Sequence, residues 1–322
     1  MDVFINLLLV AIGFVLLIKG ADFLVNGASS LAKRFNVSDI AIGLTVVAMG
    51  TSAPELVVNL ISGGEESHEL VFGNIIGSNI FNIYLILGVS AVIYPLTVQR
   101  NALWKEVPYS LIATIAFFIL VNDALFFGKE TSQLGLIDGI ILLVMFVAFL
   151  SYIFLNLQRH PDSENEEIII YSSVKTTVMI VLGIIGLVFG GELIVTNAVS
   201  IAQYYDVSQK LIGLTIVAAG TSLPELATSA VAAFHKKSDL AVGNIVGSNI
   251  FNLLLVLGMT SVIHHPLIYN DVLNLDLYLV MIGTFLLFIF MFTFGKYKLD
   301  RLEGIFYLIG FVGYMYYLFI RL

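Results

Sequence analysis

Two glutamates stand inside segments that are otherwise long and apolar. Glu55 and Glu225 each follow a proline in the motif Gly-Thr-Ser-x-Pro-Glu, at residues 50–55 and 220–225. Proline has no N–H to donate and clashes with the carbonyl four residues earlier, so carbonyl oxygens upstream of it lose their helical partners. Carboxylate, hydroxyl and carbonyl oxygens are the ligands that hard cations such as Ca²⁺ and Na⁺ bind. The motif predicts a cation site, with a kink healed by a neighbouring helix as the alternative.

A second motif, also present twice, supplies further oxygen atoms. It reads GNIIGSNIFN at residues 73–82 and GNIVGSNIFN at residues 243–252. The spacing i, i+4, i+8 places three polar side chains on one helix face in each copy, namely Asn74, Ser78 and Asn82, and Asn244, Ser248 and Asn252. Its GxxxG pairs allow close backbone approach. We expect these faces to line the cation site; the alternative is helix packing alone.

The amino-acid composition indicates the kind of protein in which these residues lie. Hydrophobic residues make up 59% of the 322 and charged residues 12%, and the mean hydropathy is +0.98. These values exclude a water-soluble globule, a disordered chain, collagen and a coiled coil, and they indicate a protein surrounded by the lipid bilayer. With no cysteine, a disulfide or thiolate metal site is excluded. No basic stripe with interleaved aromatic residues supports nucleic-acid binding.

A helix that spans a bilayer needs about 20 mostly apolar residues. By that rule the chain is predicted to be an all-α integral membrane protein with ten transmembrane helices. They are expected to begin near Val3, Ile40, Leu70, Leu103, Leu134, Thr176, Lys210, Leu240, Leu275 and Gly304.

The two halves of the chain repeat each other. Residues 20–93 align without a gap with residues 190–263, at an offset of 170. Each half contains five predicted spans, and an odd number forces the second copy to enter the membrane in the opposite sense. We therefore predict two inverted five-helix repeats at residues 1–155 and 174–322, with repeat motifs at 43–90 and 213–260, joined by an acidic linker at residues 156–173.

Basic residues test this inversion, because they gather in cytoplasmic loops. Alternate loops place three basic residues on one side, Lys129, Lys210 and Arg321, and twelve on the other: Lys19, Lys33, Arg34, Arg100, Lys105, Arg159, Lys175, Lys236, Lys237, Lys296, Lys298 and Arg301. The linker is then expected in the cytoplasm and both termini outside. A prokaryotic plasma membrane is the expected location, because the linker is too short for a regulatory domain.

Inversion also brings the two glutamates together. Both lie near the middle of a predicted span, where an ionised side chain costs about 2.5–3.5 kcal/mol on insertion scales. Around a pseudo-two-fold axis Glu55 and Glu225 would converge near the midplane, and bound cations would relieve their mutual repulsion. The alternative is that each glutamate is protonated and hydrogen-bonded to a neighbouring helix.

With both motifs present twice at matched spacing, the sequence resembles the prokaryotic sodium/calcium exchangers of the cation/calcium exchanger superfamily, over essentially its whole length. The resemblance implies a cluster of four cation sites in which Glu55 and Glu225 are shared ligands of Ca²⁺ and Na⁺. Backbone carbonyls of Thr51 and Thr221 would bind Ca²⁺. The flanking Na⁺ sites would use the carbonyls of Ala48 and Ala218 and oxygens of Thr51, Ser52, Ser78, Thr221, Ser222 and Ser248.

One position departs from the family pattern. Well-studied sodium/calcium exchangers tend to have one Asp at the position of Asn82 or Asn252 in the middle site, whereas this chain has Asn at both. The site then carries two formal negative charges where three would be available, so the resemblance does not carry over the coupling ratio.

The leading hypothesis is a secondary antiporter, not an enzyme, that exports Ca²⁺ against entering Na⁺ by alternating access. The resemblance implies that the long first and sixth spans are the gate and slide over the core of broken helices. An H⁺-coupled antiporter that uses the same glutamates is the alternative, although proton-coupled relatives carry GNxxE in place of GTSxPE. An intramembrane aspartyl protease would need a Gly-x-Gly-Asp element, which is missing, and a passive cation channel would not need a counter-ion. No cofactor and no obligatory protein partner are expected beyond the transported Ca²⁺ and Na⁺.

Overall fold

The computed structural model describes residues 3–64, 68–98, 100–156, 170–205, 218–293 and 297–321. Eight helices in this part are long and apolar enough to cross a membrane, and a ninth span is a helix pair, Asp39–Thr51 with Ala53–Gly64, bent by 46°. They correspond to nine of the ten predicted spans. The seventh predicted span begins near Lys210 and lies partly outside the described residues, as do residues 157–169 of the linker. The predicted all-helical membrane fold is confirmed. The number of ten spans is not tested by the described residues.

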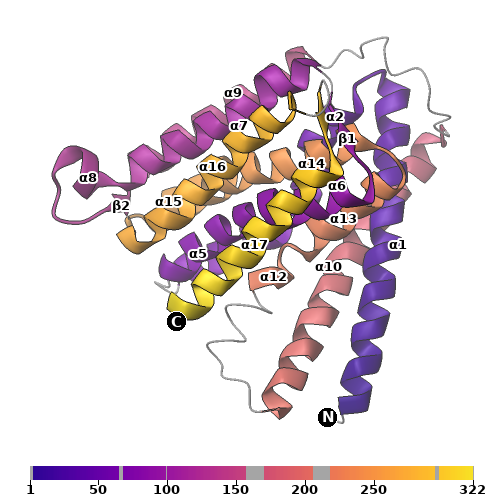
Figure 1. Cartoon of the computed structure of the whole chain (residues 1–322), viewed down its shortest axis with the longest axis horizontal. Coiled ribbons are helices and arrows are strands. Elements are labelled where there is room, and N and C mark those ends of the chain that lie inside the picture. The colour runs from indigo at the N-terminus through magenta and orange to yellow at the C-terminus, as the bar shows by residue number, and fades with distance from the viewer. Residues whose placement is uncertain are drawn as a thin grey trace.

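Two helices of unusual length stand beside the rest of the bundle. α1 (Val3–Phe35) and α10 (Ser173–Tyr204) run side by side (Figure 1). Glycines let their backbones touch: a Cβ on Gly20 would lie 2.8 Å from the carbonyl oxygen of Gly183, and one on Gly190 would lie 2.9 Å from that of Gly13. Because close glycine contacts hold membrane helices together, α1 and α10 form one packed pair.

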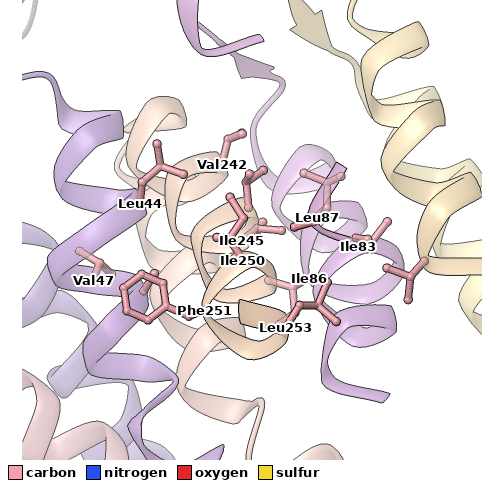
Figure 2. Packing of buried hydrophobic residues seen from close by; sticks show 14 of the residues in the cluster. Leu44, Val47, Ile83, Ile86, Leu87, Val242, Ile245, Ile250, Phe251 and Leu253 are labelled. Atoms are coloured by element: carbon pink, nitrogen blue, oxygen red, sulfur yellow. The ribbon is translucent and has the colours of Figure 1, made fainter. Parts of the chain in front are cut away.

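Two interrupted helices form the centre of the bundle. One runs through α5 (His68–Ile80), η2 (Phe81–Ile86) and α6 (Leu87–Ile93); the other runs through α14 (Ser238–Ile250), η5 (Phe251–Val256) and α15 (Leu257–His264). Their most apolar stretches are 78% and 94% buried, against 22% for α1. Figure 2 shows buried apolar side chains of both, among them Ile86 and Leu87 of the first and Ile250 and Leu253 of the second. The centre is thus shielded from lipid by the outer helices.

The remaining helices complete the outer layer. They are α7 (Arg100–Val121), α8 (Asp123–Phe127), α9 (Leu136–Leu155), η6 (Asp271–Leu273), α16 (Asn274–Phe290) and α17 (Arg301–Arg321).

Contacts between the two halves occur in crossed pairs. Strand β1 (Leu96–Thr97) pairs antiparallel with β4 (Lys298–Leu299), and β2 (Gln133–Leu134) pairs antiparallel with β3 (Leu267–Ile268). In the same way α6 packs against α17 and α9 packs against α15. β1 corresponds to β3 and β4 to β2 in the repeat, as α6 corresponds to α15 and α17 to α9. Each of these contacts is therefore repeated with the two halves exchanged, which is the pattern of a pseudo-two-fold arrangement.

Candidate cation-binding site

The two Gly-Thr-Ser-x-Pro-Glu motifs interrupt their helices in the same way. α3 (Ala48–Thr51) ends before Ser52, whose φ and ψ are −85° and 5°, and α4 (Ala53–Gly64) begins after it. In the second half α12 (Ala218–Gly220) is followed by Ser222, with φ −88° and ψ 1°, and by α13 (Leu223–Phe234). The proline near the start of α4 and of α13 requires no N–H partner there, so the sequence produces both breaks locally.

Each break places a glutamate in the first turn of a helix. Glu55 lies in the first turn of α4 and Glu225 in that of α13, and their exposed fractions are 0% and 1%. A helix N-terminus carries partial positive charge and free N–H groups, which stabilise a nearby carboxylate. The Ser52 hydroxyl, three residues before Glu55, donates to the Glu225 carboxylate, so the two breaks lie next to each other. Two buried acids thus meet at the interface of the two halves.

The Glu225 carboxylate receives donors from both halves. Its Oε1 accepts a hydrogen bond from the Ser52 hydroxyl at 3.0 Å and a longer one from the Ser248 hydroxyl at 3.4 Å. Its Oε2 has no hydrogen-bond partner among the described residues. Glu225 therefore keeps one oxygen available for a ligand.

The Glu55 carboxylate has fewer partners. It faces the hydroxyls of Ser78 and Thr221, but among the described residues neither of its oxygens makes a hydrogen bond of normal geometry. A buried carboxylate left in this way is costly, and a cation is the ligand that would satisfy it.

The two threonines of the motif make matching contacts across the interface. Thr51 Oγ1 donates to Asn244 Oδ1 at 3.2 Å, and Thr221 Oγ1 donates to Asn74 Oδ1 at 3.3 Å. Asn74 donates to Asn59 at 2.7 Å, and Asn244 donates to Ser229 at 2.9 Å. These amides are occupied by protein partners, so Asn74 and Asn244 orient the threonines instead of lining the site with free oxygens.

Four asparagines form a second crossed network, which we call the asparagine clasp: Asn79, Asn82, Asn249 and Asn252. Asn82 Nδ2 donates to Asn249 Oδ1 at 2.9 Å, and Asn252 Nδ2 donates to Asn79 Oδ1 at 3.1 Å. Asn79 Nδ2 also donates to the Asn249 carbonyl at 3.4 Å. Asn82 and Asn252 lie in the π-helical segments η2 and η5, a local form that is frequent at functional sites. The clasp fixes both amides, and their Oδ1 atoms have no partner among the described residues.

Seven buried oxygen atoms from these motifs have no hydrogen-bond partner among the described residues: both of Glu55, one of Glu225, and one each of Ser78, Ser222, Asn82 and Asn252. Buried polar atoms are nearly always hydrogen-bonded in native proteins, so seven unpaired oxygens on six residues of two repeated motifs mark a candidate ligand site. Carboxylate, amide and hydroxyl oxygens suit hard cations. The arrangement can hold cations such as Ca²⁺ or Na⁺.

The structure thus gathers most of the residues selected from the sequence. The Ala48 carbonyl already accepts from the Ser52 N–H at 2.9 Å and from the Thr51 hydroxyl at 3.3 Å, and Ala218 begins α12 at the edge of the described residues. Sequence reasoning missed Asn79 and Asn249. Both lie inside the repeated GNIxGSNIFN block, so their identity in the two copies was the available signal.

Comparisons with known proteins agree with this geometry. The sequence profile of the family described as sodium/calcium exchanger protein matches residues 5–155 and 175–320. The putative antiporter CaxA of Alkalimonas amylolytica is 37% identical over 96% of this chain and 97% of its own. The sodium/calcium exchanger MaX1 of Methanosarcina acetivorans is 30% identical over 98% and 99%. A structure of the sodium-calcium exchanger NCX_Mj, soaked with zero Na⁺ and Ca²⁺, superimposes with a TM-score of 0.84 at 33% identity, covering 98% of this chain and all of that one.

Proposed function

Because the chain belongs to the sodium/calcium exchanger family, and is therefore a cation exchanger and not an enzyme, we propose that it moves Ca²⁺ out of the cytoplasm in exchange for Na⁺ that enters. The observation that carries the proposal is the set of unpaired oxygens around Glu55 and Glu225. Both ions are hard cations that bind such oxygens. They would therefore compete for one site.

The proposed ligands divide by chemistry. Glu55 and Glu225 are shared by Ca²⁺ and Na⁺, and the backbone carbonyls of Thr51 and Thr221 complete the Ca²⁺ site. Na⁺ binds at the flanking positions, with oxygens from Ala48, Ser52, Ser78, Ala218, Ser222 and Ser248. Asn82 and Asn252 face the middle site with neutral amide oxygens. Support comes from the burial of the two glutamates and of Ser52, Ser78, Asn82, Ser222, Ser248 and Asn252, and from the free oxygens described above.

Competition for two carboxylates explains exchange. An empty site holds two buried negative charges, which resist transfer through a low-dielectric path. A cation-loaded site is compensated and can pass between inward-facing and outward-facing states. The packed pair of α1 and α10 lies against the broken helices α13, α12 and α3, and we propose that this pair slides over them as the gate. In the prokaryotic plasma membrane, both termini would lie outside.

Proton coupling is the second candidate function. It is favoured by one observation: Glu55 and Glu225 are both buried, and neither oxygen of the Glu55 carboxylate makes a hydrogen bond of normal geometry among the described residues. Like charges in close proximity favour uptake of a proton. An H⁺-coupled antiporter would bind protons on the same two carboxylates.

Calcium uptake into proteoliposomes separates the two candidates. Vesicles loaded with Na⁺ and diluted into Na⁺-free buffer should accumulate radioactive Ca²⁺, whereas vesicles with only a pH gradient should not. Uptake that needs only the pH gradient would replace Na⁺ by H⁺ and keep the site. No uptake under either gradient would contradict the proposed function.

A further inference from the structure

The charge of the site can be counted from the segments that build it. Residues 39–64, 68–93, 211–234 and 238–264 contain no Lys and no Arg. Besides Glu55 and Glu225, their acidic residues are Asp39, Glu69 and Asp239, all in the first turn of a helix at the far end of its segment. No described basic side chain forms an ion pair with either glutamate. The formal charge of the empty site is therefore minus two.

The asparagine clasp keeps the middle of the site neutral. Asn82 and Asn252 use their Nδ2 groups as donors to Asn249 Oδ1 and Asn79 Oδ1. A carboxylate at either position would place an acceptor oxygen against an acceptor oxygen, because Asp has no N–H to donate. The clasp therefore favours an amide side chain at residues 82 and 252 and disfavours a third carboxylate there.

We propose that the clasp makes this protein exchange two Na⁺ for one Ca²⁺, with no net charge moved in a cycle. The proposal deepens the function proposed above and rests on it. One Ca²⁺ or two Na⁺ neutralise two carboxylates, whereas a third Na⁺ would leave one uncompensated positive charge on a site that must cross a low-dielectric barrier. Asn79 and Asn249 act as positioning residues, since they hold the amides that offer neutral oxygens to the ions.

The number of Na⁺ exchanged per Ca²⁺ is measured from the Ca²⁺ gradient that balances a known Na⁺ gradient, so that no net Ca²⁺ flux remains. Proteoliposomes of the full chain are given a tenfold Na⁺ gradient, and the membrane potential is clamped with K⁺ and valinomycin. For two Na⁺ per Ca²⁺ the Ca²⁺ gradient at balance is about 100-fold and does not change with voltage; for three it is about 1,000-fold at zero potential and shifts about tenfold per 59 mV.

The two possible failures are distinct. A wild-type protein whose Na⁺-driven Ca²⁺ gradient shifts about tenfold per 59 mV would overturn the two-for-one ratio and keep the exchanger. A wild-type protein that holds no Ca²⁺ gradient with Na⁺ would contradict the proposed function itself.

A charge variant tests the role of the clasp. Asn252→Asp adds a third negative charge, and we expect its Ca²⁺ gradient to become voltage-dependent, by up to about tenfold per 59 mV. Asn252→Ser is the neutral control and should stay insensitive to voltage. Asn82→Asp in the other half is the second variant if Asn252→Asp does not fold. An aspartate variant that exchanges and stays voltage-insensitive would overturn the claim that charge at the clasp sets the ratio.

Discussion

The two glutamates occupy equivalent places in the two halves but have different surroundings. Glu225 accepts hydrogen bonds from Ser52 and Ser248, whereas Glu55 has no such bond among the described residues, although Ser78 and Thr221 face it. The motifs are nearly identical, so local sequence does not cause the difference.

The asymmetry has a consequence for transport. Because the motif residues of the two halves are nearly identical, we expect a counterpart arrangement in which the roles of the two glutamates are exchanged. In that counterpart Ser222 would donate to Glu55, and Glu225 would lose the Ser52 bond. Two such arrangements are what alternating access requires. The difference between the two glutamates is thus a marker of which state the site is in.

The largest effect should come from removing either charge. Glu55→Gln and Glu225→Gln should each lower Na⁺-driven Ca²⁺ uptake at least about 100-fold, because carboxylate count is a main determinant of Ca²⁺ affinity. In ion-free buffer the variants should differ: Glu55→Gln removes an unpartnered charge and should leave thermal stability equal or higher, whereas Glu225→Gln should lower it. Uptake that survives in one variant would show that the ions do not share both carboxylates.

Cross-linking the proposed gate to the core should hold the site in one arrangement and stop exchange. Asp22 on α1 contacts His235 after α13, with 2.9 Å between Oδ1 and Nε2. Because the chain has no cysteine, Asp22→Cys with His235→Cys can be bridged by Cd²⁺. Exchange should then fall by at least about tenfold, since the pair of α1 and α10 can no longer move over the core, and a chelator should restore it.

The matched control bridges the two helices of the gate to each other. Ser30 and Thr176 lie on α1 and α10, with 3.0 Å between their hydroxyl oxygens. Ser30→Cys with Thr176→Cys should retain exchange after oxidation, if the pair moves as one body. Loss of exchange here, with activity kept in the Asp22 and His235 pair, would place the moving surface between α1 and α10.

In the asparagine clasp the amides of Asn82 and Asn252 make equivalent bonds, to Asn249 and Asn79, so these two positioning residues sharpen the comparison. Asn249→Ala should raise the Ca²⁺ concentration for half-maximal uptake by about tenfold, as is usual for groups that orient a metal ligand. Asn79→Ala should raise it more, because the Asn79 side chain makes two hydrogen bonds of the network. The maximal uptake rate is measured as well. Misfolding would lower the maximal rate and leave the half-saturating Ca²⁺ concentration unchanged.

Much of this fold could be predicted from the sequence, because each motif occurs twice at matched spacing. Hydropathy predicts the spans, the prolines predict both breaks, and the position of Glu55 and Glu225 near the middle of apolar spans predicts their burial. The π-helical turns η2 and η5 could not be predicted, because nothing in the residue pattern distinguishes them from α-helix.

The clasp and the asymmetry escaped prediction for another reason. Asn79 lies one residue beyond Ser78, and a regular helix turns it away from the polar face; its partner Asn252 belongs to the other half. Contacts between halves arise from tertiary packing. Near-identical repeats can predict only a symmetric site, so the unequal bonding of the two glutamates needs the folded structure.

The smallest effect, and the sharpest test of the comparison, is on ion-free stability. Ser52→Ala removes the 3.0 Å bond to the Glu225 carboxylate and should lower the free energy of unfolding by about 1.5–3 kcal/mol, the range for hydrogen bonds to charged groups. Ser222→Ala removes a hydroxyl with no partner among the described residues and should change it little. The measurement is a pair of unfolding curves in Na⁺-free buffer with a chelator, repeated with saturating Ca²⁺, which should reduce the difference because the cation then compensates both carboxylates. Equal losses for the two serines without ions would mean that the two arrangements are equally populated, and the asymmetry would no longer identify a state.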